Sequence, residues 1–123
     1  MRILILAALV LCACHTPVED RAHHVVHHGE SAVLYNSSGP TVLLAYSVAD
    51  CYPIEKAVAE KDEAALRNFL TQGKAFAVAT GASVQVISEA SDERQVRVNE
   101  GPLAGKTGWV MWEFLRAPEP ATR

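Results

Sequence analysis

Apolar and polar residues alternate along the second half of the chain in a pattern typical of short strands. Several runs carry this alternation, with β-branched or aromatic residues on one side. They are Lys74–Val78, Ser83–Glu89, Gln95–Asn99 and Thr107–Trp112. Short connectors that hold glycine or polar residues separate them, as in hairpins. The pattern predicts a small, mainly β barrel or sandwich.

The last of these runs is apolar on both faces. Trp109 and Met111 share one face, while Val110 and Trp112 share the other. Such a strand is expected inside the barrel or beneath a covering element. We expect Trp109 to be a core residue, and Phe114, just beyond the strand, to be another. The preceding Gly108 predicts a close approach of another segment to the backbone or a bulge.

A helical insert is predicted between the first two strands. Pro40–Tyr46 has the apolar character of a strand. Ile54–Glu60 and Glu63–Gln72 then repeat apolar residues at helical spacing, as two short helices or one bent helix. Asp62 is suited to cap the second part and Gly73 to end it. We expect the insert to lie across one mouth of the barrel.

The N-terminus has the pattern of a secretory signal. Arg2 precedes the apolar run Ile3–Ala13, which is shorter than the ~20 residues that cross a bilayer. The run ends Leu11-Cys12-Ala13-Cys14, which resembles a bacterial lipobox. The resemblance implies cleavage after residue 13, diacylglycerol on the Cys14 sulfur and an acyl chain such as palmitate on its amine. A plain secretory signal and an uncleaved apolar N-terminus are the alternatives.

The end of the chain resembles a known domain family. Gly105-Lys-Thr-Gly-Trp-Val110, followed by Trp112-Glu-Phe-Leu115, is similar to the end of bacterial SH3-like domains of the SH3b class. Gly81–Ile87 resembles another strand of that family, whereas Arg94 and Gln95 stand where many members carry an aromatic residue. The resemblance covers residues 73–115. It implies an SH3-like barrel over residues 40–117, which leaves residues 118–123 as a disordered tail.

Residues 14–39 are predicted to be a lipid anchor and a flexible, histidine-rich tether. Ser31–Tyr35 has enough apolar character to add a short strand. All the histidines of the chain lie in this segment, and four of them are spaced so that a helix would pair them at i, i+4. These weak metal candidates are His23, His24, His27 and His28. A polar tether that gains charge below about pH 6.5 explains the same histidines, so we assign no metal and no cofactor.

The composition of the chain disfavours two classes of function, nucleic-acid binding and catalysis. The net charge is −3 at pH 7, and loss of Arg2 on cleavage makes it −4, which disfavours a nucleic-acid surface. Cleavage and lipidation leave Cys51 as the one free thiol, either buried or able to pair with another chain. The histidines lie only in the tether, so no nucleophile–histidine pair can be placed on rigid elements. We therefore do not expect an enzyme.

The remaining aromatic residues suggest a binding role. Tyr46, Tyr52 and Trp112 are the candidate ligand-binding residues, since SH3-like surfaces hold extended ligands on aromatic side chains. We expect a lipid-anchored protein of the cell envelope that binds peptidoglycan or an envelope protein. His15 after the lipidated cysteine implies the outer membrane, facing the periplasm. The alternative is a small inhibitor or immunity-type lipoprotein that blocks an incoming lytic enzyme or phage.

Overall fold

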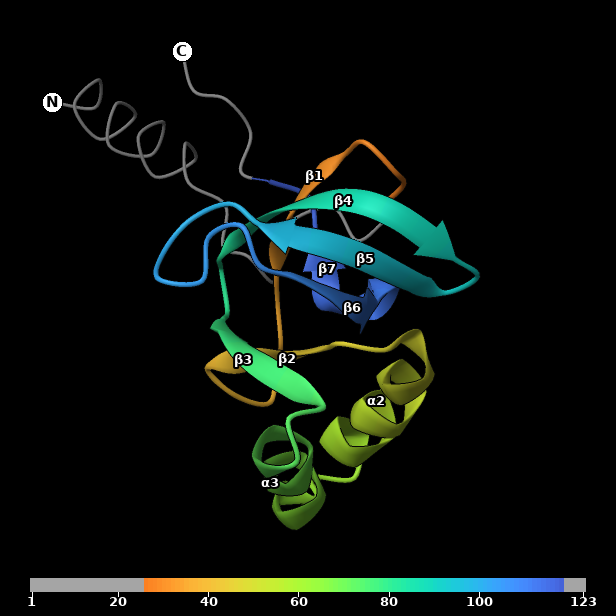
Figure 1. Cartoon of the computed structure of the whole chain (residues 1–123), viewed down its shortest axis with the longest axis vertical. Coiled ribbons are helices and arrows are strands. Elements are labelled where there is room, and N and C mark those ends of the chain that lie inside the picture. Colours follow the sequence, from red (N-terminus) through yellow and green to blue (C-terminus); the bar gives the residue numbers. More distant parts are fainter. Residues whose placement is uncertain (1–25, 119–123) are drawn as a thin grey trace, which may run out of the picture.

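A computed structural model describes residues 26–118, which form one curled sheet and a pair of short helices (Figure 1). The sheet is a half-barrel of antiparallel strands in the order β3-β2-β6-β5-β4-β1-β7. Its strands are β1 (Ser31–Leu34), β2 (Thr41–Ala45), β3 (Ala75–Ala79), β4 (Ser83–Ala90), β5 (Glu93–Val98), β6 (Thr107–Met111) and β7 (Leu115–Arg116). The helices are η2 (Val48–Asp50), α2 (Cys51–Ala59), α3 (Glu63–Thr71) and η3 (Trp112–Phe114). The predicted mainly β fold with a helical insert is confirmed.

The core lies on the concave face of the sheet. It is lined by alternate residues of the strands, so that Val84 and Val86 of β4 meet Val96 and Val98 of β5. Leu44, from β2, is fully buried in the same cluster. The period-two pattern predicted these inward faces because only one side of each strand meets the interior.

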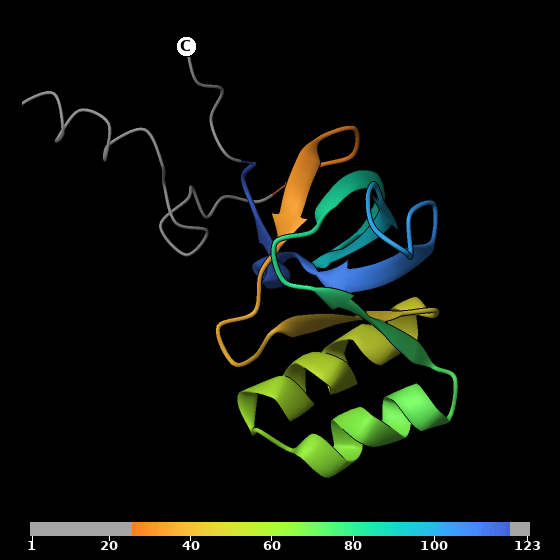
Figure 2. The same cartoon turned by 90° about the vertical axis from the view of Figure 1, so that its left-hand side faces the viewer.

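The helical insert covers the outer side of the β2–β3 pair, where Figure 2 shows both helices beside these strands. The Asp62 side chain accepts a hydrogen bond from the Ala65 N–H at 3.1 Å and caps α3 as predicted. Gly73 has a φ of 72° just beyond the helix. A second apolar cluster forms where Ile54 and Cys51 of α2 meet Ala45 of β2. None of the helices within residues 26–118 is long and apolar enough to cross a membrane.

The predicted tether over residues 14–39 is wrong for its second half. The optional strand exists as β1, which pairs with β4 and β7. Val26, Ala32 and Leu34 are buried in the main core. The domain therefore begins no later than Val26, and the insert follows the second strand, not the first. Scattered apolar residues hid this segment, because a four-residue strand has too few positions to show a period.

Arg94 explains why the chain enters the fold at this place. The residue is 3% exposed, and its Nε donates to the Val26 carbonyl at 2.6 Å. One Nη donates to the carbonyls of Ser91 and Glu93 at 2.7 and 2.9 Å. A buried guanidinium with several carbonyl acceptors holds the N-terminal segment against the β4–β5 hairpin. The sequence does not predict this role, because the burial of an arginine is not visible in a local pattern.

The closing strand differs from the prediction in which face enters the barrel. Val110 is buried in the main core, whereas Trp109 is half-buried and packs on the second cluster beside the helices. Phe114 is also half-buried and contacts both clusters. Gly108 is buried, and a Cβ there would lie 2.8 Å from Leu44 Cβ, so the predicted close approach is confirmed. Both faces of β6 meet apolar atoms, as expected, but the indole lies outside the barrel.

Candidate binding groove

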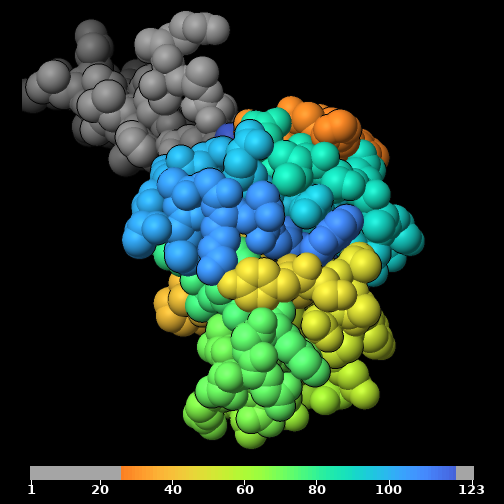
Figure 3. Space-filling view, in the orientation of Figure 1, coloured from red at the N-terminus to blue at the C-terminus, as the bar shows by residue number. Residues whose placement is uncertain are grey.

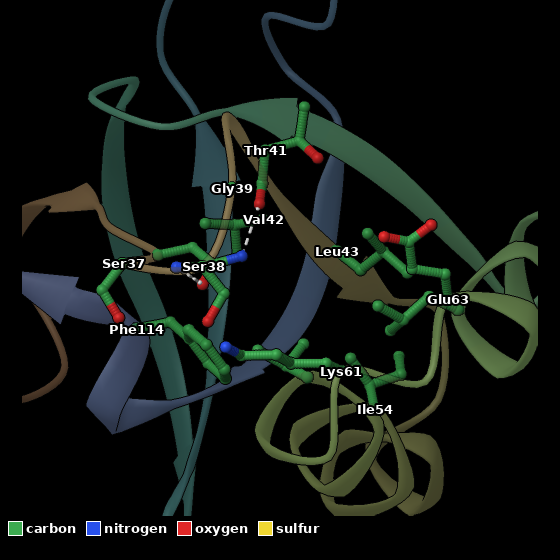
Figure 4. A pocket seen from close by; sticks show the side chains of 13 residues that line it. Ser37, Ser38, Gly39, Thr41, Val42, Leu43, Ile54, Lys61, Glu63 and Phe114 are labelled. Carbon is green, nitrogen blue, oxygen red and sulfur yellow. Dashed lines mark hydrogen bonds between the residues drawn. The ribbon is translucent and has the colours of Figure 1, made fainter.

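A groove of about 580 Å³ separates the helical insert from the sheet and the β1–β2 loop (Figure 4). Five parts of the chain line it: residues 36–39, residues 41–43, Ile54 and Val58 of α2, Lys61, Glu63 and Leu66 around the α2–α3 turn, and Phe114 of η3. We call it the helix–sheet groove. Its volume falls within the range of small-ligand sites.

The groove exists because β2 diverges from its neighbouring strand, β6. The β2–β6 ladder contains only the pair Ala45–Trp109, so residues 41–43 have no partner in β6. The β1–β2 loop fills part of the gap. Asn36 Nδ2 donates to the Thr41 carbonyl at 2.9 Å, and Asn36 Oδ1 accepts from the Ser38 N–H at 2.9 Å. These bonds, drawn in Figure 4, fix the loop that forms one wall.

The interior of the groove is apolar and its rim is polar. Val42 and Ile54 are buried, while Leu43, Val58 and Phe114 are half-buried. The exposed side chains at the rim are the hydroxyls Ser37 and Ser38 and the charged residues Lys61 and Glu63. Apolar walls with a few polar groups at the edge are the usual composition of a ligand site.

Lys61 is placed by an uncommon backbone conformation. Its φ is 55°, in the left-handed region that few non-glycine residues occupy. The residue sits in the turn between α2 and α3, where its N–H donates to the Val58 carbonyl at 3.1 Å. Figure 4 shows its side chain extending across the groove toward Phe114 and Ser38. The turn therefore places a cation across a groove that has both apolar and polar lining residues.

A pair of carboxyl groups lies beside the groove. Glu55 of α2 and Glu113 of η3 line a smaller adjoining hollow with Arg116. A hydrogen bond from Glu113, followed by burial and the charges of Glu113 and Asp92, raises the pKa of Glu55 from 4.5 to about 7. Two carboxyls that share a proton this way resist a second negative charge. This edge of the molecule is therefore acidic, and its charge changes near neutral pH.

The predicted binding aromatics lie outside the groove lining. Tyr46 follows β2 and is 49% exposed, while Tyr52 in the first turn of α2 is 61% exposed. Figure 3 shows their connecting segment, in yellow, on the surface between the insert and the blue C-terminal strands. Lys106 Nζ lies 5.3 Å from the centre of the Tyr46 ring. Trp112 is half-buried in η3 and is separate from the lining. The tyrosines offer a second surface, not a wall of the groove.

Some of the histidines and cysteines lie within the described residues, and the others lie outside them. His27 and His28 lie at a turn, not in a helix, and both contact Glu89: His27 Nδ1 at 3.2 Å and the His28 N–H at 2.7 Å. The hydrogen bond from the His28 N–H, followed by that from the His27 side chain, lowers the pKa of Glu89. Within residues 26–118 no three metal-ligating side chains lie close enough to hold an ion. His23, His24 and Cys14 lie outside the described residues. Cys51 is 2% exposed, and burial raises its pKa to about 12, so the first of the two alternatives for this thiol, burial, is confirmed.

Comparison with known proteins identifies no relative. The chain matches no protein-family model, and neither a curated protein nor a solved structure is similar to it.

The groove was not predicted, because its walls come from segments far apart in the sequence. The positive φ of Lys61 and the failure of β2 to follow β6 have no local signature.

Proposed function

We propose that this chain is a lipid-anchored protein of the bacterial envelope whose SH3-like domain binds a cell-wall or envelope-protein partner in the helix–sheet groove. The groove is the observation that carries the binding role, since it combines apolar walls with a hydroxyl, cation and anion rim. The lipobox resemblance at Cys14 supports the anchor. One acyl chain holds a protein only marginally, whereas two or three hold it firmly.

The short distance from anchor to fold supports a role near the membrane. The fold begins by Val26, so only the chain between Cys14 and that residue remains as a spacer. Extended, this length spans at most ~40 Å. The domain therefore begins within this range of the bilayer, in the layer where cell-wall polymer and other envelope proteins lie.

The groove chemistry suits peptidoglycan or an extended peptide. Both carry amide groups, to which Ser37 and Ser38 can donate hydrogen bonds. Both present carboxylates, which fit Lys61, and amines, which fit Glu63. Leu43 and Val58 accept the apolar parts of either ligand.

A charge-reversal pair tests the binding role. The detergent-purified full chain is incubated with purified sacculi, and retained protein is measured after sedimentation. Lys61→Glu should reduce retention at least tenfold. Lys56→Glu should leave it unchanged, because Lys56 is also exposed but lies on α2, outside the groove lining. In cells, a crosslinker should capture an envelope protein that Lys61→Glu loses. If sacculi and crosslinking both show equal results for the two variants, the groove does not bind such a partner.

The anchor is tested separately. Cys14→Ser removes the sulfur that would carry diacylglycerol, so the protein should leave the membrane fraction and lose labelling by a palmitate analogue. Cys51→Ser, in the buried core position, is the matched control and should keep both properties. Membrane retention and acyl labelling that persist in Cys14→Ser would contradict the lipid anchor.

The acidic edge at Glu55 and Glu113 favours a second candidate function. A lysine or arginine from a partner would neutralise this pair and release the shared proton. A basic lytic enzyme such as lysozyme fits this edge, so an inhibitor role remains a separate proposal. A lysozyme assay with added protein decides it: inhibition that Glu113→Lys abolishes supports this role, and no inhibition at micromolar protein excludes it.

A further inference from the structure

We propose that the free edge of β3 accepts an extended peptide segment with a basic residue at one end, which adds a strand to the open half-barrel. This edge lies away from the helix–sheet groove, and its proposed role does not depend on the function proposed for that groove. Three observations support the role: the register of β3, a cavity along its edge and the charge beside that cavity.

The register shows which backbone groups of β3 are free. At the two ends of the β2–β3 pair, the Thr80 N–H donates to the Pro40 carbonyl at 2.9 Å and the Tyr46 N–H to the Lys74 carbonyl at 3.0 Å. Hydrogen-bonded pairs alternate along an antiparallel ladder. The N–H and C=O of Phe76 and Val78 therefore face β2. Those of the alternate residues, Ala75, Ala77 and Ala79, point away from it.

Nothing in the described residues forms a ladder along that side. β3 is the terminal strand of the sheet, and β2 is the only strand that pairs with it within residues 26–118. The Ala79 carbonyl accepts the Ala82 N–H at 3.1 Å, as its outward direction requires. The strand, Ala-Phe-Ala-Val-Ala, holds no charge and no proline, although these are the usual means of blocking an edge.

A cavity of about 580 Å³ runs along this edge between residues 77–82 and residues 100–103. Three consecutive residues of the strand, Ala77, Val78 and Ala79, line it. A cavity over one face of a strand would touch alternate residues, so this one lies beside the backbone. A strand residue fills ~160 Å³ at ordinary strand and sheet spacings. The space therefore holds about three to four residues of extended chain.

The geometry selects a single extended segment as the occupant. The loop at residues 100–103 lines the cavity opposite the strand, so an edge strand that brings a folded domain with it would meet this loop. Glu100 is the one charged residue of the lining, and it is exposed. One of its carboxylate oxygens accepts the Ser83 N–H at 3.0 Å, which leaves the other for a ligand. A lysine or arginine at the end of the peptide that lies beside Glu100 complements this carboxylate.

The first test uses the peptide acetyl-Val-Ala-Val-Ala-Lys-amide, labelled with a fluorophore, and the detergent-purified full chain. Fluorescence anisotropy should report binding, and hydrogen exchange in residues 74–80 should slow at least tenfold at saturation. Ala77→Pro removes the outward N–H but leaves the β2 ladder intact, a change that edge strands tolerate. It should weaken binding at least tenfold, whereas Ala77→Val, which keeps the N–H, should not.

The second test keeps the protein unchanged, in case Ala77→Pro does not fold. Methylation of the peptide nitrogens on one edge should abolish binding, because those N–H groups would donate to the outward carbonyls of β3. Glu100→Gln should weaken binding several-fold for the lysine peptide but not for a version that ends in glutamine. Equal binding of methylated and unmethylated peptides would overturn the proposal. Slower hydrogen exchange in residues 36–43, in place of residues 74–80, would also overturn the proposal. So would an edge of β3 that is already filled by this chain's own residues, or a dimer that Ala77→Pro dissociates.

Discussion

Gly108→Ala is the most direct test of how the half-barrel is packed. Gly108 lies in β6, and a Cβ at this position would approach two ring atoms of Phe76, a residue of β3, at 3.0 and 3.1 Å. It would also lie 2.8 Å from Leu44 Cβ. Carbon atoms in contact prefer separations of ~3.5–4.0 Å. Leu44 Cβ is fixed to the backbone of β2, so the added methyl group has to push strands apart.

The expected magnitude follows from these contacts. Inserting a methyl group into a filled core costs ~1–3 kcal/mol. Replacing glycine also lowers the entropy of the unfolded chain, which offsets ~0.4–1 kcal/mol of this cost. Gly108 does not have a positive φ, so no backbone strain is added. We therefore expect Gly108→Ala to lower the free energy of unfolding by ~1–2 kcal/mol and the Tm by roughly 5–15 °C for a domain of this size.

Gly39→Ala is the matched control. Nothing lies within 4 Å of a Cβ at Gly39, and its φ is not positive either. The same chemical change there should leave stability unchanged or raise it by up to ~1 kcal/mol. Urea unfolding measures both variants, with the m-value as a check that the unfolded surface is the same. Two variants of equal stability would refute the close contact of β2, β3 and β6 at Gly108.

Three further predictions concern buried or coupled groups. Arg94→Met keeps the apolar stem but leaves the carbonyls of Val26, Ser91 and Glu93 without their donor; we expect ~2–4 kcal/mol of destabilisation and faster proteolysis before β1, with Arg97→Met on the exposed side as control. The folded-state pKa of Glu55 is raised to about 7, so stability should be greatest below pH 4.5 for this group and fall as pH rises toward 7; Glu113→Gln should flatten that slope in urea titrations at several pH values, and an unaltered slope would rule out the coupling. The thiol of Cys51, with its pKa raised to about 12 by burial, should react with a disulfide reagent at pH 8 only as fast as the protein unfolds, and rapid reaction without urea would show that it is accessible.

Local signals in the sequence were sufficient where neighbours in the chain determine the conformation. Asp62 marks the start of α3 and Gly73 its end, as predicted, because a cap and a left-handed residue act within one turn. The hairpin loop before β6 has positive φ at Gly101 and Gly105, which glycine alone adopts without strain. The alternation in β4 and β5 likewise identified their inward residues.

Contacts between distant segments decided the rest. β1 became a strand because β4 and β7 lie on either side of it, and its own short sequence does not require this. Arg94 is buried because carbonyls converge on it from Val26 and from its own hairpin. The helix–sheet groove and the free edge of β3 depend on where one strand stops pairing with another.

The sequence by itself therefore determined the type and order of most elements, since helix and strand periods and their caps are local properties. Which face of β6 enters the barrel, where the domain begins and which surfaces stay open were decided only by the tertiary structure. The physical reason is that both faces of β6 are apolar, so hydrophobicity alone favours neither. The choice falls to shape: Gly108 and Val110 fit against Leu44 and Phe76 in the narrow interior, and the larger Trp109 packs outside beside the helices.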